Sequence, residues 1–194
     1  MLTQTALFIQ KKWKKEKIIA NILDFPHILQ PNEYSCGAAC VQSILWYYGD
    51  REKNEYELES MLQADPREWI VSKNILKFFK KKKFKLDARE MTLNDVETYI
   101  NTWIPVMVLL QARSRKKVNY TTWWDNGHFS VVIWYSKEYL LFSDPLSTTP
   151  CYLLKKEFLA RWHDVDGKTK VHNYGIAVYG KKLNYDSLSL KKIW

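Results

Sequence analysis

The chain has 194 residues, of which 46% are hydrophobic and 15% aromatic, a composition that excludes a disordered chain and suits one domain with a substantial core. Its 30 Lys and Arg against 21 Asp and Glu give a net charge of +9. A basic surface attracts acidic proteins, nucleic acid or anionic membranes without choosing among them, and its commonest meaning is a solvated lysine-rich surface. We therefore do not expect nucleic acid as a partner, and the sequence leaves the oligomeric state open.

Three cysteines do not form a disulfide framework, which favours a reducing compartment. No apolar run approaches the roughly 20 residues of a membrane span. The first residues place their apolar side chains ahead of their lysines and lack a small-residue cleavage site, unlike a signal peptide. We expect a soluble, cytoplasmic protein, with export by a non-classical route left open.

Residues 1–25 are expected to form a basic arm or an extra surface helix, because lysines alternate there with apolar residues. The first well-defined helix begins at Ser35 or Cys36 and ends near Gly49, since glycine is a favoured helix stop. Four of its apolar residues follow helical spacing, namely Val41, Ile44, Leu45 and Tyr48.

Two more helices are predicted over residues 55–63 and 72–80, the second with Ser72 as its N-cap. Alternating apolar residues predict a strand over residues 84–91. Thr92 then opens a helix with Asp95 in its first turn, where a carboxylate is favoured. The apolar faces expected for the first and last of these helices are Leu58, Met61 and Leu62, and Val96, Tyr99, Ile100 and Trp103.

From Pro105 onward, short apolar segments predict strands. The strand segments are "VMVLLQA", "HFSVVIWYS", "YLLFSDP" and "YGIAVYG", with a short helix "KKEFLARWH" before the last of them. The second and third segments are predicted to form a hairpin that turns at residues 136–138. Helices in the first half and strands in the second indicate an α+β fold rather than an alternating parallel sheet.

Cys36 stands where a loop becomes a helix, so free backbone N–H groups and the positive end of the helix dipole lie beside its sulfur. That environment favours a thiolate, and a positive partner such as histidine completes its activation. Taken alone, a cysteine here would be a small buried core residue. A nucleophilic role therefore depends on whether the sequence supplies the rest of a site.

His128 is the best candidate among four histidines, because it follows Gly127 at the start of an apolar strand, a rigid place from which a ring can face a helix end. If the hairpin turns at Ser136, His128 and Asp144 each lie eight residues from the turn. Cross-strand neighbours lie about 5 Å apart, so we expect Asp144 to hold the His128 ring. Taken alone, His128 would be a core histidine and Asp144 an ordinary turn residue.

Gln30 precedes Cys36 by six residues across a turn, so its amide could join the Cys36 backbone N–H in stabilising an oxyanion. Loss of one such donor typically lowers turnover about a hundred- to a thousandfold. The segment of residues 112–126 is basic and aromatic, and it is either a substrate-facing loop or an amphipathic cover. The residues proposed for substrate binding here are Trp123, Trp124 and Gly127.

The remaining candidates have simpler interpretations. Cys40, one helical turn after the first cysteine, is expected to pack in the core, and Cys151 to be structural or incidental. The Cys-x3-Cys spacing is not a zinc-ribbon pattern, so no metal site is expected. Asp125 is a rival orienter for the histidine, less rigidly placed in its loop. His163 is expected to end a helix, and His172 to lie in a polar loop.

Five segments resemble, in order, the papain-like cysteine peptidases that trim bacteriocin leader peptides after a double glycine, here as a stand-alone domain. They are "LQPNEYSCGAAC", "IPVMVLL", "GHFSVVIW", "YLLFSDPL" and "KKEFLARW". The resemblance covers about residues 25–162 and extends toward Gly180. It implies a papain-like fold in which the helix bearing Cys36 packs on an antiparallel sheet. It also implies Cys36 as nucleophile, His128 as base and then acid, Asp144 as orienter and Gln30 as oxyanion donor.

We therefore predict a cysteine peptidase, a thiol hydrolase with a peptide or protein substrate and no metal or organic cofactor. The peptidase domain is expected over residues 26–180, between the arm of residues 1–25 and a tail of residues 181–194. Two alternatives stay open: a papain-like enzyme that transfers the acyl group to an amine or deamidates a side chain, and a non-catalytic papain-like module that binds a partner.

Overall fold

The computed structural model describes residues 22–180 except residues 68, 113 and 115. Most of the expected arm and the whole expected tail lie outside the described residues. The helices are α2 (Cys36–Tyr47), α3 (Glu55–Leu62), α4 (Ser72–Lys81), α5 (Leu93–Asn101) and α6 (Lys155–Arg161). The strands are β1 (Lys85–Glu90), β2 (Val106–Gln111), β3 (Gly127–Tyr135), β4 (Tyr139–Ser143), β5 (Cys151–Leu154), β6 (His163–Asp166), β7 (Thr169–His172) and β8 (Tyr174–Tyr179).

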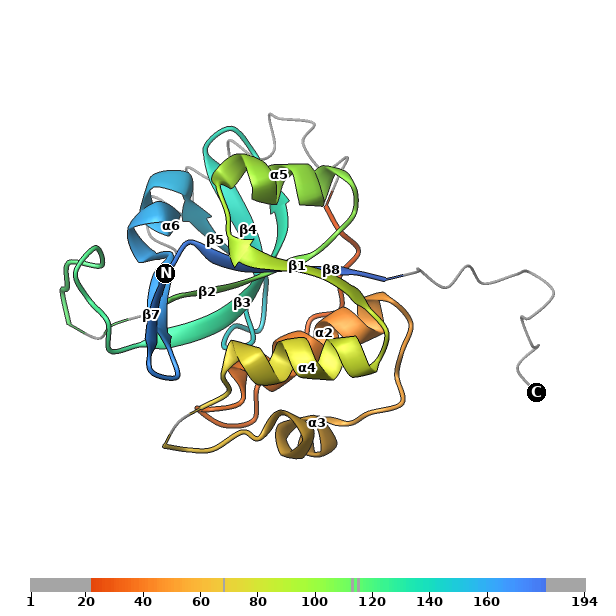
Figure 1. Cartoon of the computed structure of the whole chain (residues 1–194). Coiled ribbons are helices and arrows are strands. Elements are labelled where there is room, and N and C mark those ends of the chain that lie inside the picture. The colour runs from red at the N-terminus through yellow and green to blue at the C-terminus, as the bar shows by residue number, and fades with distance from the viewer. Residues whose placement is uncertain (1–21, 68, 113, 115, 181–194) are drawn as a thin grey trace.

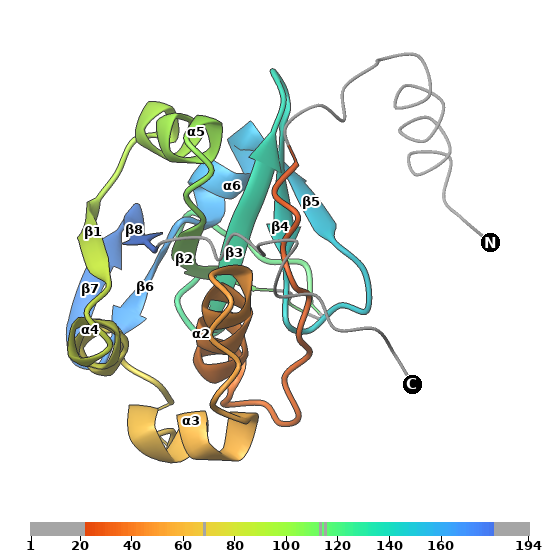
Figure 2. The same cartoon turned by 90° about the vertical axis from the view of Figure 1, so that its right-hand side faces the viewer.

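Six strands form one antiparallel sheet in the order β1-β8-β2-β3-β4-β5, and β6 and β7 pair as a separate hairpin. Helices α2, α3 and α4 lie on one side of the large sheet, and α5 and α6 lie on the other (Figures 1 and 2). Most of the helices precede most of the strands along the chain. The expected α+β class is therefore confirmed.

Helix α2 is the central helix, and all but one of its twelve residues are buried. It packs against β3, and small residues at its start allow a close approach (Figure 2). A Cβ atom built on Gly37 would lie 3.2 Å from the Ile70 Cβ and 3.3 Å from a Phe129 ring carbon. Gly49 follows the helix with φ 83°, the left-handed conformation that ends helices. The predicted start and stop are both confirmed.

The peripheral helices match their predictions in position but not in every detail. Thr92 opens α5 and Asp95 lies in its first turn, as expected, and the two residues also form a capping box. Ser72, by contrast, is the first residue of α4 and not its N-cap, which is Val71. The predicted burial of Met61 and Trp103 is wrong, since the two side chains are 45% and 47% exposed.

The central hairpin forms where predicted, with a tight turn in which Ser136 N donates to Tyr139 O. Its register differs from the prediction because the turn is centred between Lys137 and Glu138, with Tyr135 paired to Leu140, and not at Ser136. The irregularity between Val132 and Trp134 then reduces the offset by one residue. The ladder ends at the pair Val131 and Ser143. Three residues further along each strand, Leu146 and not Asp144 would stand opposite His128, so the predicted pairing is wrong by two residues.

Two features were not predicted. Strand β5 adds an edge to the large sheet beyond β4. The β6–β7 hairpin contains both His163 and His172, which pair with each other across it, so their expected places in a helix end and a loop are wrong. The hairpin turns at Gly167, with φ 63°, and Asp-Gly is a strong sequence signal for such a turn.

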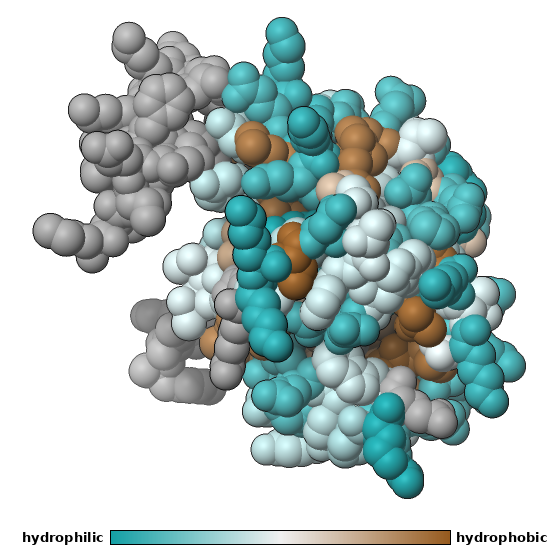
Figure 3. All heavy atoms as spheres, turned by 90° about the vertical axis from the view of Figure 1, so that its left-hand side faces the viewer, coloured by the Kyte–Doolittle hydropathy of each residue, from teal (hydrophilic) through white to brown (hydrophobic). Residues whose placement is uncertain are grey.

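Among the described residues, no helix is both long and apolar enough to cross a membrane. Figure 3 shows the face beside α6 and β7, where hydrophilic side chains surround a few separate hydrophobic patches.

Candidate active site

Cys36 is the first residue of α2 and is 2% exposed. The preceding residue, Ser35, makes no side-chain cap bond within the described structure, because its hydroxyl donates to Asn32 O at 3.2 Å. The N–H groups of the first helical turn are therefore not taken up by a cap. They and the helix dipole favour negative charge at the Cys36 sulfur.

His128 is the second residue of β3, and only 3% of it is exposed. Its Nε2 lies 3.0 Å from Asp144 Oδ1, and the ring is within hydrogen-bonding reach of the Cys36 thiol. Burial alone would lower the pKa of His128, but the bonds and charges of Asp144 and Cys36 outweigh it and raise the pKa to about 9. The ring is therefore cationic at neutral pH.

Asp144 follows β4 directly, and its carboxylate is fixed by the turn that it begins. Its Oδ1 also accepts a bond from Leu146 N at 2.9 Å, and its carbonyl accepts one from Ser147 N at 3.0 Å. This turn aims the carboxylate back at His128, so the two side chains meet beyond the end of the strand pairing.

The segment of residues 27–30 forms hydrogen bonds to that turn and to the end of β4. The His27 ring bonds to Ser143 Oγ at 2.9 Å and to the Ser147 carbonyl, and Gln30 N donates to Pro145 O at 2.9 Å. No sequence pattern indicated this role of His27. It links the strand leading to Asp144 to the segment leading to Cys36.

Gln30 lies near this assembly, with its side chain turned toward its own loop. Its Nε2 donates to Asn32 O at 2.6 Å, and its Oε1 is buried without a hydrogen-bond partner among the described residues. Gln30 does not line the cavity at Cys36. The predicted site thus has three members in contact, Cys36, His128 and Asp144, with Gln30 beside them.

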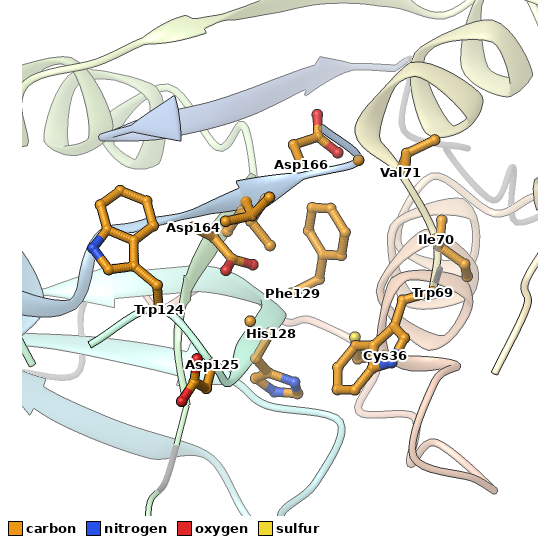
Figure 4. Close-up of a pocket in the computed structure, with 14 residues that line it drawn as sticks. Cys36, Trp69, Ile70, Val71, Trp124, Asp125, His128, Phe129, Asp164 and Asp166 are labelled. Atoms are coloured by element: carbon orange, nitrogen blue, oxygen red, sulfur yellow. The ribbon is translucent and has the colours of Figure 1, made fainter. Parts of the chain in front are cut away.

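A cavity of about 250 Å³ opens on Cys36 and His128. In Figure 4 one side carries Trp69, Ile70 and Val71, and the opposite side carries Trp124, Asp125 and Asp164. Of the three residues predicted for substrate binding, Trp124 and Gly127 line this cavity. Trp123 does not line it, and its carbonyl bonds to His163 Nε2 at 2.8 Å.

The loop before His128 is anchored to its neighbours. Arg161 of α6 lies 3.5 Å from the centroid of the Tyr120 ring, and Lys170 of β7 lies 4.5 Å from that of Trp124. The Trp124 ring also packs on His163 at 4.4 Å. These contacts hold Trp124 and the adjacent Asp125 at the wall of the cavity.

Sequence reasoning missed three residues of the cavity region: Trp69, Gln111 and Asp164. Gln111 is fully buried at the end of β2. Its Nε2 donates to Asp164 Oδ1 at 2.8 Å, and its Oε1 accepts from Asn126 N at 3.1 Å. The only signal was a polar residue that ends an apolar run. Trp69 has φ 61° and gave no signal at all.

Cys40 packs in the core as expected, and burial raises the pKa of its thiol well above the ordinary value, with smaller contributions from Cys36 and Asp144. Cys36 and Cys40 form no disulfide. In the part of the chain that the structure describes, no group of three or more His, Cys, Asp or Glu side chains is placed to hold a metal ion.

A thiol at a helix mouth, an imidazole beside it and a carboxylate behind the imidazole are the arrangement of papain-like cysteine peptidases. The chain belongs to the peptidase C39 family, whose sequence pattern matches residues 24–166. It is a cysteine peptidase, as the sequence predicted. Among curated proteins, none matches this chain.

Solved structures with the same fold are distant in sequence. A putative C39-like peptidase from Bacillus anthracis is 16% identical, with a TM-score of 0.62, over 84% of this chain and 98% of that one. The peptidase domain of Streptococcus ComA, a bi-functional ABC transporter involved in quorum sensing, is 18% identical with a TM-score of 0.60, over 80% and 98%. A double glycine motif protease from an AMS/PCAT transporter, solved in complex with the leader peptide, is 15% identical with a TM-score of 0.59, over 83% and 95%.

Proposed function

We propose that Cys36, His128 and Asp144 form the catalytic triad of this peptidase and that the Gln30 amide and the Cys36 backbone N–H hold the oxyanion. The observation that carries the proposal is the contact of three side chains that lie far apart in the sequence, with His128 between the thiol and the carboxylate. The order thiol, imidazole, carboxylate is what nucleophilic catalysis by cysteine requires.

The first half-reaction acylates the enzyme. A cationic ring beside the sulfur favours the thiolate, the nucleophilic form. The Cys36 sulfur attacks the peptide carbonyl carbon, and the π electrons move to the oxygen. When the tetrahedral intermediate collapses, the C–N bond breaks and His128 donates its proton to the leaving amine. A thioester on Cys36 remains.

The second half-reaction releases the acyl group. The neutral His128 takes a proton from water, whose oxygen attacks the thioester carbon. The C–S bond breaks, the carboxylic acid leaves, and the thiolate–imidazolium pair is restored. Asp144 keeps its bond to Nε2 throughout, so the other ring nitrogen always faces the sulfur.

The Gln30 side chain is compatible with its role because an amide nitrogen carries two hydrogens. Asn32 O accepts one of them, which fixes the amide, and the other is left for an oxyanion. The backbone bond from Gln30 to Pro145 further couples the oxyanion donor to the turn that carries Asp144.

We also propose that the substrate is a peptide or a protein segment. The double glycine motif protease was solved in complex with the leader peptide, and this chain shares its fold. A cavity of about 250 Å³ has room for one or two side chains next to the scissile bond. The compartment of the protein stays a prediction: three cysteines do not form a disulfide framework, which favours a reducing cytoplasm.

Substitution of the two helix cysteines tests the nucleophile. Cys36→Ala should abolish peptide cleavage and labelling by an electrophilic probe, with an unchanged melting temperature. Cys40→Ala, one turn further along the same helix, should keep the labelling because its thiol is buried and held as an uncharged donor to Phe129 O. Equal cleavage by wild type and Cys36→Ala would end the proposal, and mass spectrometry of the products separates hydrolysis from transfer to an amine.

A further inference from the structure

The cavity at Cys36 has an electrostatic character opposite to that of the whole chain. The chain carries 30 Lys and Arg, yet the described residues that line the cavity include no Lys or Arg. They include three carboxylates: Asp125, Asp164 and Asp166. A charge pattern that runs against the composition of the molecule requires a local explanation.

A ligand for this cavity is indicated independently of its carboxylates. The cavity opens on the Cys36 thiol and the His128 ring, so a peptide bond can be cut here only if the neighbouring substrate residues enter it. Aromatic side chains stand at its two sides, with Trp69 opposite Trp124 (Figure 4). Aromatic faces together with carboxylates are the surroundings that an alkyl ammonium or guanidinium group prefers.

The three carboxylates are not equivalent. Asp166 accepts bonds from both the backbone N and the hydroxyl of Ser72, which tie the β6–β7 hairpin to α4. Asp125 is exposed at the rim. Asp164 is 5% exposed, and its Oδ1 is held by Gln111 while its Oδ2 lies against the backbone of Gly127. Asp164 therefore holds a negative charge at a fixed position in the cavity wall. It lies beside Gly127, the residue that precedes His128.

Lys170, which contacts Trp124 of the cavity wall, does not itself line the cavity. Lys170 pairs with Val165 across the β6–β7 hairpin, and its ammonium lies over the Trp124 ring. Successive residues of a strand point to opposite faces, so Asp164 and Asp166 share the face opposite that of the pair Val165 and Lys170.

We propose that this peptidase selects substrates with a lysine or arginine side chain close to the scissile bond, and that Asp164, with Asp125 at the rim, reads its positive charge. The inference rests on the proposed function of the Cys36 site, whose cavity it uses. Burial raises the pKa of Asp164 to about 6 against the pull of Gln111, Val165 N and His128, with Asp166 adding a like charge. The Asp164 carboxyl is therefore ionised at neutral pH and above.

The test uses three peptidyl acyloxymethyl ketones that differ only in one residue: lysine, neutral norleucine of similar length, or glutamate. The residue is placed in turn at each of the four positions before the electrophilic carbon, and the Cys36 sulfur displaces the carboxylate leaving group. Rates are measured at pH 7.5 on the full chain by mass spectrometry of the labelled cysteine.

At one position at least, the lysine probe should label wild-type Cys36 roughly tenfold or more faster than the norleucine probe, since a bond to a buried charge is strong. Asp164→Asn, which keeps the shape and the bond from Gln111, should bring the lysine rate down to the norleucine rate. It should leave the norleucine rate within about twofold. Asp125→Asn should lower the lysine rate by about two- to fivefold, as an exposed pair does.

Asp24→Asn is the matched control, because it removes an exposed carboxylate that does not line the cavity, and it should change none of these rates. Equal lysine and norleucine rates in wild type, or an undiminished preference in Asp164→Asn, would overturn the proposal. An equal slowing of all three probes by Asp164→Asn would also overturn it, because Asp164 would then shape the site and not read charge.

Failure of the triad gives a different result. If no probe labels Cys36 faster than it labels Cys151, the proposed function fails. The charge preference is then decided by binding of the corresponding non-electrophilic lysine and norleucine peptides to Cys36→Ala, measured by fluorescence anisotropy. Equal affinity overturns the preference, and tighter binding of the lysine peptide supports it.

Discussion

Two carboxylates lie close to His128, and their surroundings give them different properties. Asp144 sits in a turn, accepts bonds from His128 and Leu146, and remains partly exposed. Asp164 is almost fully buried and bonds to an uncharged amide, so burial raises its pKa to about 6. Surroundings that differ in this way commonly give two carboxyls different roles at an active site.

Sequence reasoning found the first carboxylate and not the second. Asp144 was predictable because the chain order of Cys36, His128 and Asp144 matches the order of a known class of site. Asp164 lies in "WHDVDGK", whose aspartates look like turn residues. Its place beside Gly127 depends on a side-chain bond from Gln111, and no local pattern encodes such a contact.

Asp164→Asn should stabilise the protein at alkaline pH. The folded state raises the pKa of this carboxyl above its ordinary 3.8, so the folded state binds the proton more tightly than the unfolded state does. Wild-type stability due to Asp164 is therefore greatest below about pH 4 and is lost as the pH rises through about 6. A shift of about two units corresponds to roughly 3 kcal/mol at most.

Urea unfolding of wild type and Asp164→Asn at pH 4 and pH 8 measures this difference. We expect the variant to have the larger free energy of unfolding at pH 8, with the gap closing toward pH 4. A variant that is less stable than wild type at pH 8 would show that the carboxylate is held by favourable bonds that outweigh its burial.

At the scale of elements, the sequence predicted which segments form the site and missed how two of them pair. Helix α2 and strands β3 and β4 were recognisable from apolar spacing, a glycine stop and a tight turn. The register was off by two because the turn is centred between Lys137 and Glu138 and not at Ser136, an offset of three residues that the irregularity between Val132 and Trp134 reduces by one. The contact of His128 with Asp144 survives because the turn after β4 redirects the carboxylate.

At the scale of elements, Gly127 is also where β3 contacts the β6–β7 hairpin, because it lies against Asp164. A Cβ atom on it would lie 1.8 Å from Asp164 Oδ2, and the short Asp164 side chain is held in place by Gln111. Gly127→Ala must therefore displace either the hairpin or the residue before His128. We expect a loss of roughly 1–3 kcal/mol in stability, as for other overpacked sites, and slower labelling of Cys36.

A double-mutant cycle checks the cause. Adding Asp164→Ala to Gly127→Ala removes the clashing carboxylate, so the two substitutions should be strongly non-additive and the double variant should recover stability. Gly175→Ala is the matched control, because its Cβ meets the flexible Met91 side chain at 2.6 Å, which can move away. Additive losses of stability in the cycle would contradict this cause. They would mean that glycine is needed at residue 127 for its backbone conformation and not to make room for the Asp164 carboxylate.

At the scale of the whole molecule, composition predicted a basic protein with one domain, the order of helices and strands predicted the α+β class, and the family match confirms the enzyme class. The composition concealed the acidic cavity. Strand β6 reaches the site because the hairpin that contains it packs beside β2 through Gln111 and is tied to α4 by the bonds that Ser72 donates to Asp166. The net charge of a chain does not show that tertiary contacts bring three aspartates to one cavity.

The net charge of +9 repels a cationic substrate at long range, so selection of lysine must arise from short-range contacts inside the cavity. Varying the salt concentration separates the long-range contribution to lysine selection from the short-range contribution. The Debye length falls from about 10 Å at 0.1 M to about 3 Å at 1 M, and exposed charges are screened while buried charges are screened much less. Asp125 is exposed and Asp164 is 5% exposed, so their effects should respond differently to salt.

We therefore expect the effect of Asp125→Asn on labelling by the lysine probe to vanish as NaCl is raised from 0.05 to 1 M, while the effect of Asp164→Asn keeps most of its size. Each substitution, and the control Asp24→Asn, removes one negative charge and changes the net charge from +9 to +10, so their long-range fields change alike. The difference between the variants can then come only from the position and burial of each carboxylate. If the two effects fell together, Asp164 would be as solvated as the rim, and it could not be the fixed charge that selects the substrate.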